Sequence, residues 1–150
     1  MSYLETQMEA LALENPLKAT AIAMKILKTV ELIKADSPSL QMRSGKAAFK
    51  MLADLDVEMM IAVMFDRKGS MFIHEGPFGD IRTSILFFRP LAKEILLRDA
   101  VVVHFYHNHP CGNIPSDTDK ELKETLIEYF HPFELQMEFR VVTPSVIFDY

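Results

Sequence analysis

The sequence predicts one mixed α/β domain, of the layered α+β kind, preceded by a helical arm. Two nearly continuous apolar runs, 58–66 and 100–106, have the character of strands that are covered on both faces. Segments with helical apolar periodicity lie before, between and after these runs. A length of 150 residues suits a single domain. Strands and helices that mix along one chain indicate a sheet flanked by helices.

The N-terminal arm is expected to be helical over residues 2–34. Asn15-Pro16 divides it, as a cap residue followed by proline at the first helical position. The cluster Asp36-Ser37-Pro38-Ser39 predicts a turn, and therefore a boundary between an arm at 1–40 and a core domain at 41–150. We expect the arm to pack on the core, on a second copy as a homodimer, or on a partner protein.

The elements of the core domain are predicted from periodicity and from turn residues. They are a helix at 46–55 after Ser44-Gly45, strands at 58–66, 71–75 and 81–87, a helix at 90–99, a strand at 100–106, a helix at 116–130, and strands at 135–143 and 146–150.

Composition excludes some classes of function. A formal net charge of −5 and a pI near 5.5 make nucleic acid an unfavourable partner, because binding to it needs clustered positive charge. Cys111 is the only cysteine, so no intrachain disulfide is available and a reducing compartment is expected. We see no signal peptide and no apolar run of roughly 20 residues. These features predict a cytoplasmic protein with no membrane partner.

His107 and His109 are the centre of the candidate site. They stand at i and i+2 at the end of an apolar run, so on an extended segment both side chains project to one side. The Pro/Gly/Asn turn that follows allows Asp119 to fold back onto them. Two imidazoles and a carboxylate are the protein half of a catalytic zinc site, which keeps one position open for water.

Asp119 has a second interpretation. Ser116-x-x-Asp119 ahead of an apolar periodic segment is similar to a helix capping box, with aspartate in place of the preferred glutamate or glutamine. Judged on composition alone, capping is the better account of both residues. The two roles are partly compatible, because a helix N-terminus also favours a carboxylate.

Hydrolysis at such a site also needs a general base. The candidates are Glu58, Glu75, Glu94 and Glu121. Glu58 is favoured because it leads directly into an apolar strand, where a charge is otherwise unexplained. The alternative is an ordinary surface charge at a strand end.

The combination of Glu58, the segment His107-Asn108-His109-Pro110-Cys111-Gly112-Asn113 and Pro115-Ser116-x-x-Asp119 resembles the JAB/MPN (JAMM) metalloprotease motif. More narrowly, it resembles the RadC-like branch, over residues 58–150. The loop between His109 and Ser116 is one residue shorter than the usual pattern, and Cys111 replaces a serine.

The resemblance implies a fold and a set of roles. The fold is a curved mixed sheet flanked by helices, similar to that of cytidine deaminases. His107, His109 and Asp119 become zinc ligands, Glu58 the general base, and Ser116 a residue that holds the water and the oxyanion.

The expected function is a zinc-dependent hydrolase of peptide or isopeptide bonds, with a protein or peptide substrate such as a ubiquitin-like conjugate. One alternative is a RadC-type accessory protein of DNA repair or recombination, which the acidic composition disfavours. Another is a non-catalytic scaffold that binds partners through the arm, which the complete motif disfavours.

Overall fold

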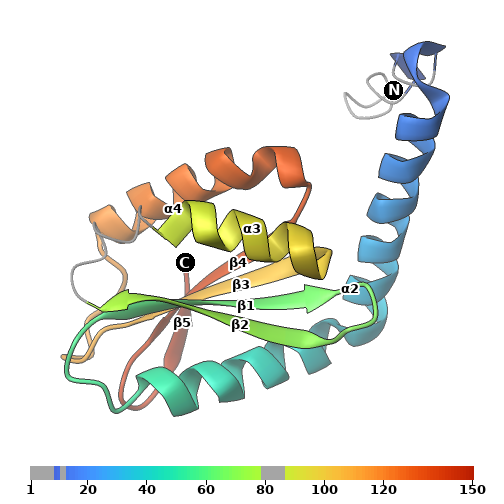
Figure 1. Ribbon diagram of the computed structural model, residues 1–150. Coiled ribbons are helices and arrows are strands. Elements are labelled where there is room, and N and C mark those ends of the chain that lie inside the picture. Colours follow the sequence, from blue (N-terminus) through green and yellow to red (C-terminus); the bar gives the residue numbers. More distant parts are fainter. Residues whose placement is uncertain (1–8, 11–12, 79–86) are drawn as a thin grey trace.

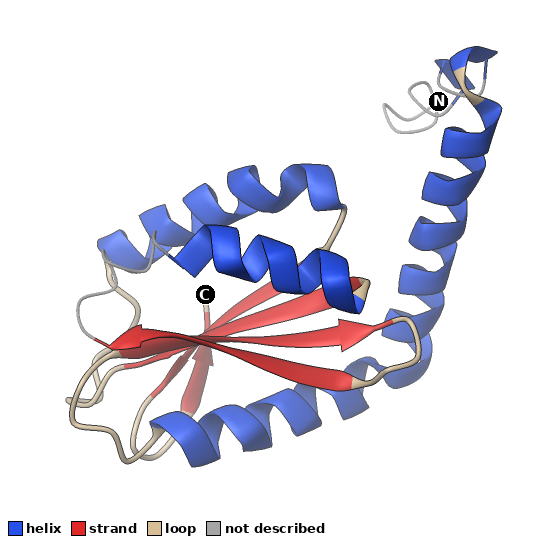
Figure 2. Ribbon diagram, viewed as in Figure 1, coloured by secondary structure: helices blue, strands red, loops and turns tan. Residues whose placement is uncertain are grey.

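A mixed sheet lies between helices on both of its faces (Figures 1 and 2). The computed structural model describes residues 9–10, 13–78 and 87–150, with the backbone alone for 25–37 and 77–78. Its elements are α2 (Pro16–Leu52), β1 (Met59–Asp66), β2 (Met71–Phe78), α3 (Phe88–Arg98), β3 (Ala100–Asn108), α4 (Asp117–Phe130), the 3-10 helix η2 (His131–Phe133), β4 (Gln136–Val142) and β5 (Ile147–Asp149). The predicted mixed α/β fold is confirmed.

The strands that the structure describes form a five-stranded sheet in the order β2-β1-β3-β4-β5. β1 runs antiparallel to β2 and β3, β4 runs parallel to β3, and β5 runs antiparallel to β4. The parallel connection from β3 to β4 passes through α4, as parallel pairs require a crossover. β3 is buried along its whole length, which explains the continuous apolar run in the sequence.

Alternating side chains divide the core into two layers. α3 and α4 cover one face of the sheet, and the C-terminal half of α2 covers the other (Figure 1). The first layer includes Met60, Leu91, Val103, Phe105 and Leu126. The second includes Leu40, Leu52, Ile61, Val63 and Val101.

The turn predicted at residues 36–39 is wrong, because α2 is one helix that passes through Pro38. Ser44-Gly45 also lies inside this helix rather than before a new one. Burial of Leu40 and Leu52 against the sheet stabilises the second half of α2, and this outweighs the local preference for a break. Asn15 caps the helix as predicted, accepting a hydrogen bond from the Lys18 N–H at 3.2 Å. The domain boundary near residue 40 stays a prediction.

A closed ring of polar contacts, called the hydrogen-bond ring below, joins α2 to the sheet through four hydrogen bonds and a contact between His104 and Glu138. Arg140 donates to the Tyr106 hydroxyl oxygen (2.9 Å) and to Glu138 Oε2 (2.7 Å). The remaining distances are 2.6 Å from Tyr106 Oη to Ser44 Oγ, 2.7 Å from Ser44 Oγ to His104 Nδ1, and 3.3 Å from His104 Nε2 to Glu138 Oε2. Every hydrogen in the ring has an acceptor when Tyr106 donates to Ser44, Ser44 to Nδ1, and Nε2–H to Glu138. Ser44 has no exposed surface, so this group has a structural role.

β2 extends beyond its predicted end at residue 75, through Gly76 and Pro77. Because β2 lies at the edge among the described strands, it tolerates a proline that cannot donate to the ladder. A Cβ at Gly76 would lie 2.6 Å from the Met60 carbonyl oxygen, close to a register shift between β1 and β2, so glycine suits this position. The strand predicted at 81–87 falls almost entirely on residues 79–86, which lie outside the described part of the chain.

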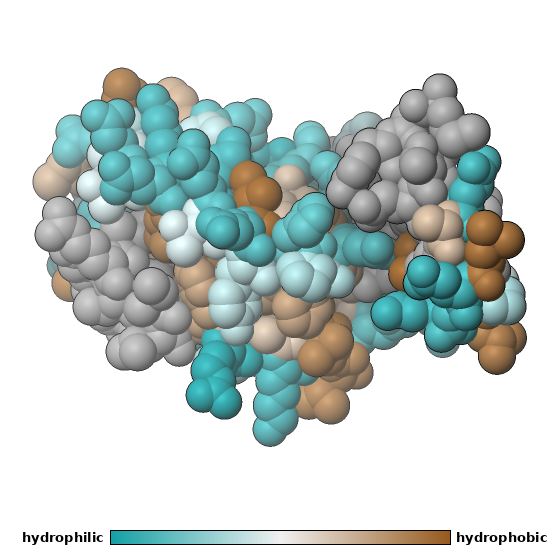
Figure 3. Space-filling model, turned by 90° about the horizontal axis from the view of Figure 1, so that it is seen from above, coloured by the Kyte–Doolittle hydropathy of each residue, from teal (hydrophilic) through white to brown (hydrophobic). Residues whose placement is uncertain are grey.

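The other predicted elements agree with the structure to within about two residues at each end. On the side covered by α3 and α4, hydrophilic and hydrophobic residues are interspersed (Figure 3). Among the described helices, none combines the length and the apolar character needed to cross a membrane.

Candidate metal centre

Two neighbouring elements bring the three predicted ligands together. His107 belongs to the end of β3, and His109 follows directly, held by a hydrogen bond from its N–H to the Val142 carbonyl of β4 (2.9 Å). A turn closed by the Gly112 N–H and the His109 carbonyl (2.9 Å) then redirects the chain, with Gly112 at φ +78°. Asp119 lies in the first turn of α4, and all three side chains are buried.

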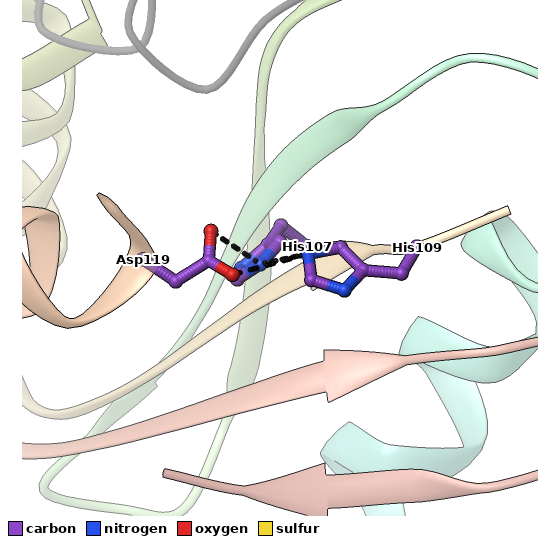
Figure 4. A group of neighbouring side chains, drawn as sticks. All are labelled: His107, His109 and Asp119. Carbon is purple, nitrogen blue, oxygen red and sulfur yellow. Dashed lines mark hydrogen bonds and ion pairs between the residues drawn. The ribbon is translucent and has the colours of Figure 1, made fainter. Parts of the chain in front are cut away.

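The side chains of His107, His109 and Asp119 point toward one another (Figure 4). The two Nε2 atoms are 3.1 Å apart. Asp119 Oδ1 lies 3.2 Å from His107 Nε2, and Oδ2 lies 3.2 Å from His109 Nε2. The shortened loop before Ser116 therefore does not prevent Asp119 from reaching both histidines.

This arrangement fits a tetrahedral metal ion. Ligands placed about 2.0–2.1 Å from zinc at tetrahedral angles are separated from each other by about 3.3 Å. The observed separations of 3.1 and 3.2 Å are close to that value. Two imidazoles with one carboxylate are also donors that zinc accepts. Within the described residues, these three form a group that could hold a metal ion.

The outer nitrogen of each imidazole also has a partner. His109 Nδ1 lies 2.8 Å from the Asn113 carbonyl oxygen, and because a carbonyl can only accept, this nitrogen carries the hydrogen. His109 Nε2 is then left with the lone pair that a metal ion requires. His107 Nδ1 lies 3.2 Å from the Tyr150 hydroxyl.

Asp119 completes the helix cap that the sequence indicates, and its carboxylate also faces the two histidines. Its Oδ2 accepts the Ser116 N–H at 2.7 Å, and its own N–H donates to Ser116 Oγ at 3.2 Å, which completes the capping box. Burial opposes ionisation of Asp119, but hydrogen bonds from His107 and Ser116 outweigh burial and lower its pKa to about 2. The carboxylate is thus ionised at neutral pH, as a metal ligand must be.

A family model of the RadC-like JAB domain matches residues 42–143, which include all three of these residues. The chain belongs to the RadC-like JAB family. No match is found among the curated proteins. The family assignment made from the motif is therefore confirmed, and the mixed sheet between helices is consistent with the JAB-type fold.

In this RadC-like chain, Glu58 lies one residue before β1, at the end of the sheet that carries the histidines. Met60 pairs with His107 in antiparallel register, so the chain leading back from Met60 to Glu58 runs in the direction of His109. Met59 packs in the layer under α2 and Met60 in the layer under α3 and α4. If the strand alternation continued one residue beyond β1, Glu58 would face the side that holds His107. Its role as base stays a prediction.

The backbone around Glu58 is held by Asn108, a residue to which sequence analysis gave no role. Asn108 Oδ1 accepts the Met59 N–H at 2.7 Å, and Asn108 Nδ2 donates to the Val57 carbonyl at 2.8 Å. The middle residue of His107-Asn108-His109 thus binds the peptide groups on both sides of Glu58. Asn108 is 1% exposed. Strand alternation directs its side chain away from those of His107 and His109, and this alternation could have suggested from the sequence that Asn108 has a separate, structural role.

The remaining candidates are Ser116 for the oxyanion role and Glu75, Glu94 and Glu121 for the base. Ser116 Oγ is engaged in the helix cap, and its predicted role at the water and the oxyanion stays a prediction. Glu75 is exposed on β2 and Glu121 is exposed on α4. Glu94 pairs with Arg98 at 3.4 Å on α3.

Proposed function

We propose that this protein is a zinc-dependent hydrolase of peptide or isopeptide bonds, acting on a protein or peptide substrate such as a ubiquitin-like conjugate. The observation that carries the proposal is the buried convergence of His107, His109 and Asp119 in a RadC-like JAB domain. Three protein ligands at ligand-like separations, with a fourth position left for water, are the arrangement expected of a catalytic zinc site.

The ligand set suits a cation because of its charge. With both histidines neutral and Asp119 ionised, it carries a net charge of about −1 in a buried site. When bound, a zinc ion supplies Lewis-acid polarisation of a carbonyl and a lowered pKa for water. His107 and His109 hold it through Nε2, and Asp119 supplies the carboxylate.

Glu58 supplies the proton transfer in this proposal. Its carboxylate takes a proton from the attacking water and returns it to the nitrogen of the leaving amine, so that one residue acts first as base and then as acid. The support is its position at the histidine end of the sheet and the two hydrogen bonds from Asn108 that hold its neighbouring peptide groups. Ser116 would add its hydroxyl as a donor toward the oxyanion.

Glu58→Gln separates catalysis from metal binding. With zinc-loaded protein and a library of quenched fluorescent peptides plus lysine ε-linked isopeptides, we expect the wild type to cleave at least one class. Loss of the base lowers the rate by about 10²–10⁴-fold, because general base catalysis contributes that much. Zinc content, measured by atomic emission, should stay unchanged.

Glu75→Gln and Glu121→Gln are the matched controls, since both residues are exposed carboxylates that the sequence also offers as bases. Both should cleave at the wild-type rate. Equal rates for Glu58→Gln and wild type would remove Glu58 from the mechanism. Loss of zinc in that variant would make it a ligand instead. If the zinc-loaded wild type cleaved nothing and shifted DNA at physiological ionic strength, the RadC-type accessory role would take precedence.

A further inference from the structure

A tyrosine from outside the family-matched segment contacts the candidate metal centre. The Tyr150 hydroxyl lies 3.2 Å from His107 Nδ1, and its ring meets the imidazole edge-on, with centroids 5.6 Å apart at 83°. The family match ends at residue 143, so this contact comes from a part of the chain that the match does not include.

The main chain of Tyr150 is fixed at both of its polar groups. Its N–H donates to the Phe139 carbonyl at 3.1 Å, which continues the pairing of β4 with β5. Its carbonyl oxygen accepts a hydrogen bond from Lys123 Nζ of α4 at 2.6 Å. The Lys123 ammonium also lies over the rings of Tyr150 and Phe139, at 5.9 and 5.4 Å from their centroids. The side chain thus extends toward His107 from a backbone held by two elements.

Metal binding through His107 Nε2 demands a particular tautomer. Nε2 must offer its lone pair, so the hydrogen belongs on Nδ1. A buried N–H without an acceptor is unfavourable, and ligating histidines accordingly donate their outer N–H to a carbonyl, a carboxylate or water. For His109, the Asn113 carbonyl is that acceptor. For His107, the group at this position is the Tyr150 hydroxyl.

The Tyr150 hydroxyl oxygen can accept a hydrogen bond as well as donate one, so at 3.2 Å it can serve as the acceptor for a hydrogen on His107 Nδ1.

We propose that Tyr150 is a positioning residue for the metal centre. Its hydroxyl accepts a hydrogen bond from His107 Nδ1–H and so fixes the imidazole with Nε2 toward Asp119 and His109. This inference rests on the metal-binding part of the proposed function and adds to it a residue that the motif does not contain.

Tyr150→Phe tests the hydroxyl while keeping the ring. We expect zinc affinity, measured by competition with a chromophoric chelator, to fall by about 10–100-fold, the usual cost of losing such an outer hydrogen bond. Tyr129→Phe is the control, because the Tyr129 ring packs against Phe88 and Phe130. This control should bind zinc as the wild type does. Circular dichroism of both metal-free variants checks that folding is intact.

Nitrogen NMR of the imidazole groups in the zinc-loaded wild type is a second, independent measurement of the His107 hydrogen bond. It should show the His107 Nδ1–H protected from exchange, as expected of a proton donated to the Tyr150 hydroxyl, so the inference stays testable even if Tyr150→Phe fails to fold. Unchanged zinc affinity in a folded Tyr150→Phe, or a freely exchanging His107 Nδ1–H, overturns this inference and leaves the proposed function standing. A wild type that binds no zinc overturns both.

Discussion

At the scale of single residues, Asp119 connects the fold to the site. One of its oxygens faces each histidine, and Oδ2 also accepts the N–H of Ser116 at the start of α4. The helix cap therefore fixes the carboxylate in the orientation that a metal ion would use. The two demands are compatible here, since a helix N-terminus favours the ionised form of the carboxylate and a metal ion binds that same form.

Asn108 is the residue whose removal should most directly disturb the segment that carries Glu58. Asn108→Ala leaves the Met59 N–H and the Val57 carbonyl without their partner, and Asn108 itself is buried. We expect the free energy of unfolding of the metal-free protein to fall by about 1–3 kcal/mol, measured by urea denaturation.

Asn113→Ala is the matched control for this substitution. Asn113 is exposed and holds His109 through its main-chain carbonyl, which alanine retains. Its unfolding free energy should stay within about 0.5 kcal/mol of the wild type. Equal stability of the two variants would show that the Asn108 side chain does not hold this segment.

At the scale of elements, the long helix α2 depends on the sheet for its second half. The hydrogen-bond ring from Arg140 through Tyr106, Ser44 and His104 to Glu138 joins α2 to β3 and β4. The His104 imidazole in the hydrogen-bond ring is 2% exposed, so placing a positive charge on it in the folded protein is unfavourable. Burial lowers the pKa of His104 from 6.5 to about 4, against a raising effect of Glu138 and with a further lowering effect of Arg140.

This shift makes the stability depend on pH. Between pH 6.5 and 4 the unfolded chain protonates His104 while the folded chain does not, so stability falls as pH decreases through this window. The contribution is about 3 kcal/mol, fully present above pH 6.5 and lost by pH 4. Urea denaturation of the metal-free protein at several pH values should show this slope, and His104→Gln should reduce it.

His131→Gln is the control for the pH series, because His131 is exposed in η2. It should keep the wild-type slope. An identical pH dependence for His104→Gln and wild type would contradict the assignment of the slope to the buried ring.

The two failures of sequence analysis at this scale have a common physical cause. Pro38 and Ser44-Gly45 are local signals for a break, but burial of α2 against the sheet outweighs them. In contrast, the placement of His107 and His109 on one side of a strand end, and of Asp119 at a helix start, was predictable from the sequence. Strand alternation and the helix start signal determine these placements locally. Tyr150 and Asn108 were not, since their partners lie 43 and 49 residues away and pairing depends on the strand register.

At the scale of the whole molecule, the candidate metal centre and the hydrogen-bond ring lie on opposite faces of the sheet. The predicted ligands lie where the end of β3 meets the first turn of α4, whereas the hydrogen-bond ring lies on the α2 face of the same strand. Apolar side chains on the N-terminal part of α2, among them Leu17 and Met24, are exposed. We propose that the N-terminal arm, residues 1–40, binds a second copy of this chain or a partner protein.

We propose that His107, His109 and Asp119 bind a catalytic metal ion. Isothermal titration of the chelator-treated protein with zinc tests it most directly, with Asp119→Asn as the matched variant that preserves an acceptor for the Ser116 N–H. We expect one zinc ion per wild-type chain, and an affinity at least about 100-fold weaker for Asp119→Asn because the ionised ligand is lost. No zinc binding by the folded wild type, or equal binding by both proteins, would contradict the account.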